Sequence, residues 1–169
     1  MPLTRDEVLG AMEQGFHAFL HELRDLQYSL DWKRDFNDAG AWSPRDIITH
    51  LMGTLELNTY RALQAIIMDD TPTVQLDGNN PYRSPETRAM TLAQLLDRLE
   101  TLEDRLEELV SSVPDAQLAR KARITGWADG TPLRELTFLE VAHRAFTVHW
   151  PEHTKQLYAI REELGVAEL

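Results

Sequence analysis

The sequence predicts an all-α protein, a four-helix bundle with long connections, and three observations support this prediction. Apolar residues recur at steps of three and four in four separate segments, which is the period of an amphipathic helix. Residues that cap helix N-termini precede these segments. The connections between the segments contain Pro, Gly and Asn, which interrupt helices. Four amphipathic helices that bury their apolar faces against one another form a bundle.

The first predicted helix begins after Thr4, which together with Glu7 matches a capping box. Its apolar residues continue at helical steps from Val8 to Leu30, so we expect the helix to extend to Leu30. A polar connection, residues 31–41, leads from there to the second helix.

The second predicted helix has Ser43 as its N-cap and Pro44 in its first turn, where proline is tolerated. Its apolar stripe covers residues 47–67. The next connection, residues 69–90, is long and contains several helix-breaking residues. It has room for a crossover along the bundle or for one extra helical turn that begins at Pro85.

The third predicted helix carries a regular leucine seam. It begins with a capping box formed by Thr91 and Gln94, and its apolar steps alternate between three and four over residues 92–113. We expect the fourth helix to begin near Thr131 and to end at Gly165, because glycine suits the position after a helix C-terminus.

We expect no β-sheet, because no segment alternates cleanly between apolar and polar residues. Residues 114–130 are therefore interpreted as a second long connection, and its basic residues 120–123 as a solvated run or as a group that holds an anionic part of a substrate. Trp42 and Trp127 flank helix starts and are expected to anchor the packing there.

Composition excludes several classes of protein. The length of 169 residues suits one domain covering residues 1–169. Because 28 acidic residues face 17 Lys and Arg, the net charge of −11 disfavours nucleic acid and anionic membranes as partners. The absence of cysteine excludes disulfides and thiolate ligands. No apolar stretch is long enough to span a bilayer and no signal-peptide pattern is present, so we expect a cytoplasmic protein.

Two of the six histidines occupy the otherwise apolar stripe of the fourth helix. His149 and His153 lie one helical turn apart, which is the spacing by which a helix brings two imidazoles to one divalent ion. A hydrogen-bonded pair is the alternative, because a buried imidazole needs a partner. The candidates for a third ligand, which spacing alone does not distinguish, are His50, His143 and an acid such as Glu56 or Glu152.

Two segments resemble the DinB/YfiT-like superfamily. Residues 42–51 read Trp-Ser-Pro-Arg-Asp-Ile-Ile-Thr-His-Leu, which is similar to the Trp-Ser…His-Leu motif of that family. Residues 149–157 match its His-x3-His-x2-Gln element followed by an apolar residue. The family fold is a four-helix bundle, and the resemblance covers nearly the whole chain. It implies that His50, His149 and His153 hold one divalent metal ion, namely Zn²⁺, Ni²⁺ or Fe²⁺.

Pro151 is a departure from the family pattern, because it lies between the two histidines of the fourth helix. Proline removes a backbone donor, frees the carbonyl of Thr147 and kinks or breaks a helix. The kink either turns both imidazoles into a groove or separates them. The alternative is that Trp150 and Pro151 end one helix and begin another.

The resemblance implies a metal-dependent enzyme. Three imidazoles leave an open coordination position, and a metal ion lowers the pKa of a bound water or thiol. Members of the family include transferases that use low-molecular-weight thiols, and related bundles perform hydrolysis or isomerisation. Since the chain has no cysteine, any thiol must come from a cosubstrate. The alternative is a stress protein that holds a metal or a small ligand without turnover.

The expected partners are a small-molecule substrate, a low-molecular-weight thiol and a second copy of the chain in a homodimer. No residue is identified as catalytic. His17 and His21 are expected on the surface. Side chains that either line a substrate pocket or lie on the helix surface are Asn58, Tyr60, Arg61 and Glu152.

Overall fold

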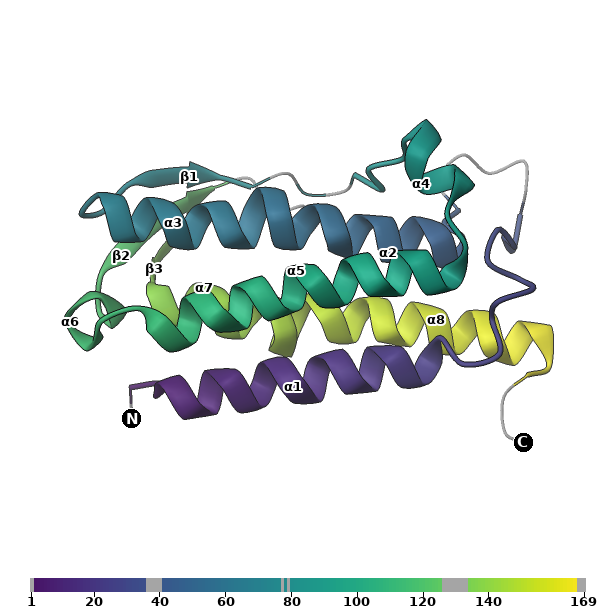
Figure 1. Ribbon diagram of the computed structural model, residues 1–169, viewed down its shortest axis with the longest axis horizontal. Helices are drawn as coiled ribbons and strands as arrows, with labels where there is room; N and C mark the ends of the chain where they lie inside the picture. The colour runs from purple at the N-terminus through teal and green to yellow at the C-terminus, as the bar shows by residue number, and fades with distance from the viewer. Residues whose placement is uncertain (1, 36–40, 77, 79, 126–133, 167–169) are drawn as a thin grey trace.

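The computed structural model describes residues 2–35, 41–76, 78, 80–125 and 134–166. Within these residues the chain forms four long helical segments, as the sequence predicts (Figure 1). Two of the four contain a π-helical stretch, in which backbone hydrogen bonds reach five residues back. In chain order the segments are α1 (Arg5–Glu22); α2 (Pro44–Gly53), η1 (Thr54–Tyr60) and α3 (Arg61–Met68); α5 (Leu92–Ser112); and α7 (Phe138–Arg144), η2 (Ala145–His149) and α8 (Trp150–Leu164).

The four segments are not arranged in simple sequence order around the bundle. Helix α1 packs against α5, α7 and α8, whereas α2 packs against α5 and α8. The first and second segments therefore lie diagonally across the bundle from each other. Figure 1 also shows that α1 and α7–α8 run in one direction while α2–α3 and α5 run in the other. Because the second and third segments are parallel, the chain between them must return along the length of the bundle.

The connection between α3 and α5 makes this return. It contains β1 (Thr73–Gln75) and then follows α2 to α4 (Pro85–Ala89), whose N-cap is Ser84 (Figure 1). The predicted crossover and the predicted helical turn at Pro85 are thus both present. The crossover brings residues 80–83 alongside α2, which positions the site described below.

A small sheet at one end of the bundle corrects the expectation that the protein contains none. Strand β1 pairs in parallel with β2 (Lys121–Thr125), and β2 pairs antiparallel with β3 (Arg134–Thr137), in the order β1-β2-β3. In β2 the apolar Ala122 and Ile124 are buried, while the alternating residues Lys121 and Arg123 are exposed. This period-two alternation is present in the sequence, but the strand is short and its outward residues form the basic run.

The basic run 120–123 supports this end of the fold. Lys121 and Arg123 form ion pairs with Glu135 on the neighbouring strand. Arg120 donates a hydrogen bond to the carbonyl of Ile67 at the end of α3, at 2.9 Å. The short helix α6 (Asp115–Leu118) connects α5 to β2.

The first helix is shorter than its apolar spacing predicts. It begins with the predicted capping box and ends at Glu22, not at Leu30. The chain continues in turns, in which Asp25 has a positive φ of 65°. Leu23, Leu26 and Leu30 are nevertheless buried, because the turns keep the same residues against the bundle. Apolar spacing therefore identified the core residues correctly and the helix boundary wrongly.

The start of the fourth helix also differs from the prediction. Thr137 caps the helix and forms a capping box with Glu140, so the helix begins at Phe138. The predicted start at Thr131 lies outside the described residues, but residues 134–137 are a strand. The predicted end is confirmed, since Gly165 adopts the left-handed conformation with φ 68° at the C-terminus of α8.

The core lies between the four segments. The predicted seam of α5 is buried at Leu95, Leu99, Leu102 and Leu106. On the opposite side, the fully buried Trp150 packs against a group of aromatic rings at centroid distances of 4.9 to 5.8 Å: Phe16, Phe19 and Phe146. In the described part of the chain, no helix has the length and apolar character to cross a membrane.

Candidate metal centre

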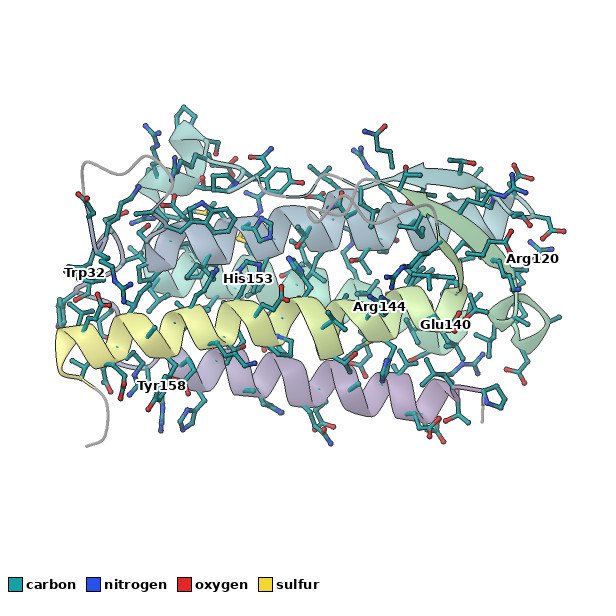
Figure 2. All side chains as sticks on the ribbon, turned by 180° about the vertical axis from the view of Figure 1, so that it is seen from behind. Trp32, Arg120, Glu140, Arg144, His153 and Tyr158 are labelled. Atoms are coloured by element: carbon teal, nitrogen blue, oxygen red, sulfur yellow. The ribbon has the colours of Figure 1, made fainter. Side chains whose placement is uncertain are left out.

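Three histidines from two helical segments converge inside the bundle. His50 lies on α2, His149 at the end of η2 and His153 on α8. Nε2 of His149 is 2.9 Å from Nε2 of His50 and 3.0 Å from Nε2 of His153. Figure 2 shows His153 on the inner side of α8, where α8 packs against α2, and Tyr158 on its outer side. The cluster thus lies between α2 and α8, with His149 half-buried.

The hydrogen bonds of the Nδ1 atoms determine whether the Nε2 atoms that face the cluster carry a proton. Nδ1 of His50 lies 2.7 Å from the backbone carbonyl oxygen of Asn80, and a carbonyl can only accept, so this nitrogen carries the proton. Nδ1 of His153 donates in the same way to Oε1 of Gln156 at 2.9 Å. Both rings therefore present an unprotonated Nε2 to His149.

Protons alone do not satisfy these three nitrogens. A neutral His149 carries at most one proton on Nε2, which can be donated to His50 or to His153 but not to both. The other close contact would join two lone pairs. A cation at the centre removes this conflict, because about 2.0–2.1 Å from tetrahedral zinc to each nitrogen separates the nitrogens by about 3.3 Å. The observed spacing is close to that value, so the donor set fits a divalent metal ion.

The electrostatic environment keeps the three imidazoles neutral. Burial lowers the pKa of His50 to about 4. The pKa of His149 is lowered to about 3 by burial and by the charges of the other two histidines. Burial also lowers the pKa of His153, although the hydrogen bond to Gln156 opposes this effect. Since metal ligands must be unprotonated imidazoles, the bundle supplies them in the form that binds.

Pro151 does not separate His149 from His153. Trp150 keeps helical angles (φ −61°, ψ −43°), so the helix continues through the proline instead of ending there. The distortion is taken up before the proline, in η2, where the N–H of Trp150 donates to the carbonyl of Ala145, five residues back. π-Helical turns of this kind occur frequently at functional sites. The interpretation that one helix ends and another begins at Pro151 is therefore wrong.

Two aromatic rings flank the cluster. The ring of Trp42 stacks on that of His153, with an interplanar angle of 6° and 5.8 Å between the ring centroids. Its centroid lies 4.8 Å from that of His50. Tyr82 stacks on His50 at 6.3 Å. Trp42 therefore contacts the cluster directly in addition to preceding a helix, which corrects its interpretation as a simple packing anchor; Trp127 lies outside the described residues.

Among the described residues, no other predicted His or Glu joins the three histidines, although the pKa of the neighbouring His153, which burial lowers, is raised in part by the charge of Glu152. Asn58 is buried, whereas Arg61 and Glu152 are exposed. Tyr60 packs under the guanidinium of Arg105 at 4.9 Å. His143 is half-buried and contacts Thr147. As predicted, two further histidines are exposed on the surface of α1: His17 and His21.

Sequence reasoning missed several groups around the cluster. Gln156 stands in the His-x2-Gln element, so its role as acceptor could have been inferred from the motif. The carbonyl of Asn80 had no comparable signal, because a backbone acceptor leaves no trace in the residue type. The ring of Tyr82 had none either, because Tyr82 lies in a long connection outside both motifs. Asp46 was also missed; it holds Arg83 at 2.6 and 2.9 Å, and Lys33 lies 3.4 Å away.

Asp46 carries a negative charge near His50 and binds Arg83. Burial alone would raise the pKa of its carboxyl group. Hydrogen bonds from Arg83 and from the backbone of Ser43, with the charges of Arg83 and Lys33, outweigh that effect and lower the pKa to about 2. The carboxylate is therefore ionised at neutral pH and binds the guanidinium in the bidentate geometry that favours Arg.

Comparison with known proteins assigns the chain to a family. The family model of the DinB superfamily matches residues 9–157. The chain belongs to the DinB superfamily. This result confirms the family that the Trp-Ser…His-Leu and His-x3-His motifs predicted. A search of curated protein sequences gives no match.

Solved structures share the DinB fold. YfiT from Bacillus subtilis, described as a probable metal-dependent hydrolase with an unusual four-helix bundle topology, has a TM-score of 0.70 and 14% identity, over 97% of this chain and 91% of YfiT. A Clostridium difficile 630 protein has a TM-score of 0.66 and 11% identity over 96% and 98% of the two chains. A Streptococcus pneumoniae protein has a TM-score of 0.67 and 14% identity over 96% and 92%. At these identities the similarity establishes the fold.

Proposed function

We propose that His50, His149 and His153 bind one divalent metal ion and that the protein is a metal-dependent enzyme acting on a small molecule. The observation that carries the proposal is the convergence of three Nε2 atoms whose close contacts protons alone do not satisfy. The three potential ligand atoms lie within 4.8 Å of one another. The description of YfiT as a probable metal-dependent hydrolase supports the same conclusion.

The ligand number favours a catalytic over a structural ion. Structural zinc sites usually have four protein ligands, whereas catalytic sites keep an open position. Among the described residues, no fourth His, Asp or Glu joins the cluster. A bound ion would supply Lewis acidity and would activate a water or thiol at that position.

The surrounding residues prepare the cluster for this task. The Asn80 carbonyl and Gln156 hold protons on the outer nitrogens of two ligands, which fixes the rings and raises their basicity as donors. The rings of Trp42 and Tyr82 stack on the imidazoles of His153 and His50. Imidazole suits zinc, nickel and iron alike, so the donor set leaves the metal to be identified by analysis.

Hydrolysis is the first reaction to test, because of the similarity to YfiT. Transfer of a low-molecular-weight thiol is the second candidate, because the family includes transferases that use such thiols. Since the chain has no cysteine, the thiol would come from a cosubstrate. In that reaction the thiol loses its proton and its sulfur displaces the leaving group of the electrophile. The expected homodimer, stress-related role and cytoplasmic location stay predictions.

The test is to incubate metal-loaded protein with a panel of model esters, amides and alkylating electrophiles, each with and without cellular thiols. Product formation without thiol indicates hydrolysis, and metal-dependent loss of free thiol indicates transfer. Either activity should disappear in His153→Ala and remain in His17→Ala, whose side chain is exposed on α1. A fully loaded protein with no turnover would favour the alternative of a non-catalytic metal-binding or ligand-binding protein.

A further inference from the structure

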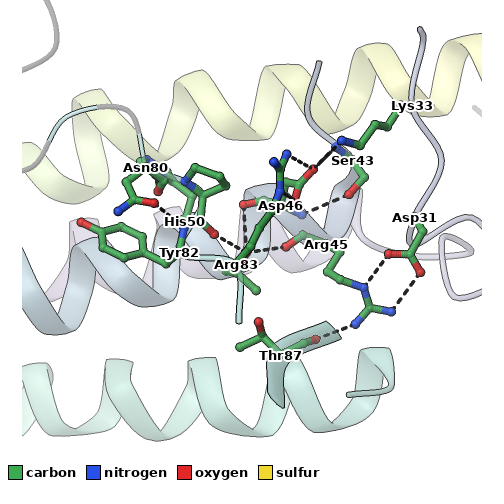
Figure 3. A network of polar contacts seen from close by, with 12 residues as sticks. Asp31, Lys33, Ser43, Arg45, Asp46, His50, Asn80, Tyr82, Arg83 and Thr87 are labelled. Carbon is green, nitrogen blue, oxygen red and sulfur yellow. Dashed lines mark hydrogen bonds and ion pairs between the residues drawn. The ribbon is translucent and has the colours of Figure 1, made fainter. Parts of the chain in front are cut away.

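Four consecutive residues of the crossover, residues 80–83, dock on one face of α2 (Figure 3). We call this segment the strap. The face of α2 that it covers consists of positions i, i+3, i+4 and i+7, which lie on one side of a helix. Its members are Asp46, Thr49, His50 and Gly53.

Each residue of the strap makes a specific contact with this face. The carbonyl of Asn80 accepts from Nδ1 of His50 at 2.7 Å, and the carbonyl of Pro81 accepts from Oγ1 of Thr49 at 2.6 Å. The last residue, Arg83, donates twice to the carboxylate of Asp46. The strap is thus fixed immediately before and after the tyrosine at position 82.

Tyr82 occupies the space above a glycine. A Cβ atom at position 53 would lie 2.2 Å from Cδ2 and 2.4 Å from Cγ of the Tyr82 ring, which is too close for any side chain. Tyr82 also has a positive φ of 49°, a region that residues other than glycine rarely adopt. Its N–H donates to Oδ1 of Asn80 at 2.8 Å, which closes a local turn. Such a backbone persists only where its surroundings hold it in place.

The anchor of the strap, Asp46, also belongs to the capping box at the N-terminus of α2. Asp46 accepts from the backbone N–H of Ser43 at 3.0 Å, and Ser43 Oγ accepts from the N–H of Asp46. One carboxylate therefore connects the N-terminus of α2 with Arg83. Because His50 lies one turn after Asp46 on the same face, the carbonyl that it binds is held by the same rigid unit.

We propose that the strap is the positioning element of the three-histidine cluster. Arg83 and Gly53 hold the Asn80 carbonyl against Nδ1 of His50, so that the proton stays on Nδ1 and the lone pair of Nε2 faces His149. Arg83 binds Asp46, and Gly53 leaves room for the Tyr82 ring, so both are positioning residues that act through Asn80 and Tyr82. The metal readout of this inference rests on the proposed function, whereas its tautomer readout does not.

Linkage makes the effect reciprocal. If a docked strap strengthens metal binding, metal binding must strengthen docking of the strap by the same factor. The backbone amides of Tyr82 and Arg83 should therefore exchange more slowly with solvent when Co²⁺ is added. Amides on the far side of α1 should not respond.

The experiment compares Arg83→Ala and Gly53→Ala with two matched controls. Arg45→Ala removes a second Arg that binds a carboxylate with two hydrogen bonds; it lies on α2, binds Asp31 and also donates to the carbonyls of Thr87 and Met90. This control therefore tests the loss of an anchor of the crossover outside residues 80–83. Gly10→Ala adds a methyl group to another helical glycine, next to which the space is open. Far-UV circular dichroism establishes that each variant is folded. Arg83→Lys keeps the charge and tests partial rescue.

Two measurements are made on each protein. Nitrogen-15 NMR of the metal-free protein reports the tautomer of His50, and competition with a chromophoric chelator reports Co²⁺ affinity. We expect an Nδ1-protonated His50 in the wild type and in both controls. We expect a tautomer mixture and about 10–100-fold weaker Co²⁺ binding in Arg83→Ala and Gly53→Ala, as for other residues that orient metal ligands. Arg83→Lys should lie between these results.

The two proposals fail differently. A wild type that binds no Co²⁺, Zn²⁺ or Ni²⁺ contradicts the proposed function, and the tautomer of His50 still tests the strap. A wild type that binds metal, together with strap variants that keep the wild-type tautomer and affinity, overturns the positioning role. Equal losses in Arg45→Ala and Gly10→Ala would also overturn it, because they would indicate general destabilisation. If one strap variant does not fold, the other decides.

Discussion

Glu103→Gln should stabilise the protein at alkaline pH and have little effect at acidic pH. Glu103 lies on α5 with only 6% of its surface exposed. Burial is the main cause that raises its pKa from 4.5 to about 7. The negative charges of four neighbouring acids add to this effect: Glu107, Asp104, Glu100 and Glu13. Among the described residues, no hydrogen-bond donor or cation compensates the carboxylate.

The sign follows from proton binding. Between pH 4.5 and pH 7 the folded protein binds this proton more tightly than the unfolded chain, so stability decreases as the pH rises. A raised pKa thus contributes stability that is present below pH 4.5 and is lost as the pH passes through about 7. Each unit of pKa corresponds to 1.36 kcal/mol, so Glu103 removes about 2.5 kcal/mol of stability between pH 5 and pH 8. The neutral glutamine cannot lose a proton and removes this dependence.

Urea unfolding of wild type and Glu103→Gln at the two pH values measures the effect, because the midpoint and slope give the free energy of unfolding. The difference between the two proteins should change by about 2.5 kcal/mol from pH 5 to pH 8, in favour of the variant at pH 8. Glu108→Gln, an exposed change on the same helix, controls for the altered net charge. A difference that is the same at both pH values would refute the reasoning.

Three further predictions concern the bundle. Leu99→Ala should lower the free energy of unfolding by about 2–5 kcal/mol in urea titration, because Leu99 is fully buried and leaves a cavity; a loss well below this range would contradict its place in the core. Thr91→Ala removes the capping box of α5 and should cost about 1 kcal/mol in the same assay, whereas Thr91→Ser should cost less. Gly165→Ala should lower the thermal midpoint, because φ is 68° and alanine disfavours that region by about 1 kcal/mol; an unchanged midpoint would count against the left-handed cap.

The helices could be predicted from the sequence because each has a long apolar stripe and a recognisable cap. The α5 seam, the capping boxes at Thr4 and Thr91 and the N-cap at Ser43 are local features, and all are present in the structure. The end of α1 could not be predicted, because Leu23, Leu26 and Leu30 keep helical spacing while lying in turns. The sheet was missed because each strand has at most five residues and depends on partners far away in sequence.

The candidate site was predictable to a similar extent. Spacing gave the pair His149 and His153, but only the family resemblance selected His50 from several candidates for the third position. The strap was beyond sequence reasoning, since its contact with His50 is made by a backbone carbonyl. The bundle topology explains why it is there. The second and third segments run in parallel, so the chain between them must pass along α2.

Metal analysis of purified protein tests the central claim most directly. The wild type and four single variants, His50→Ala, His149→Ala, His153→Ala and His17→Ala, are saturated with Zn²⁺, Ni²⁺ or Fe²⁺ and desalted, and their metal content is measured by elemental analysis. If the three histidines hold one ion, the wild type and His17→Ala should retain about one equivalent of metal, and each of the other three variants should lose most of it. Equal metal content in all five proteins, or none in the wild type, would contradict the account.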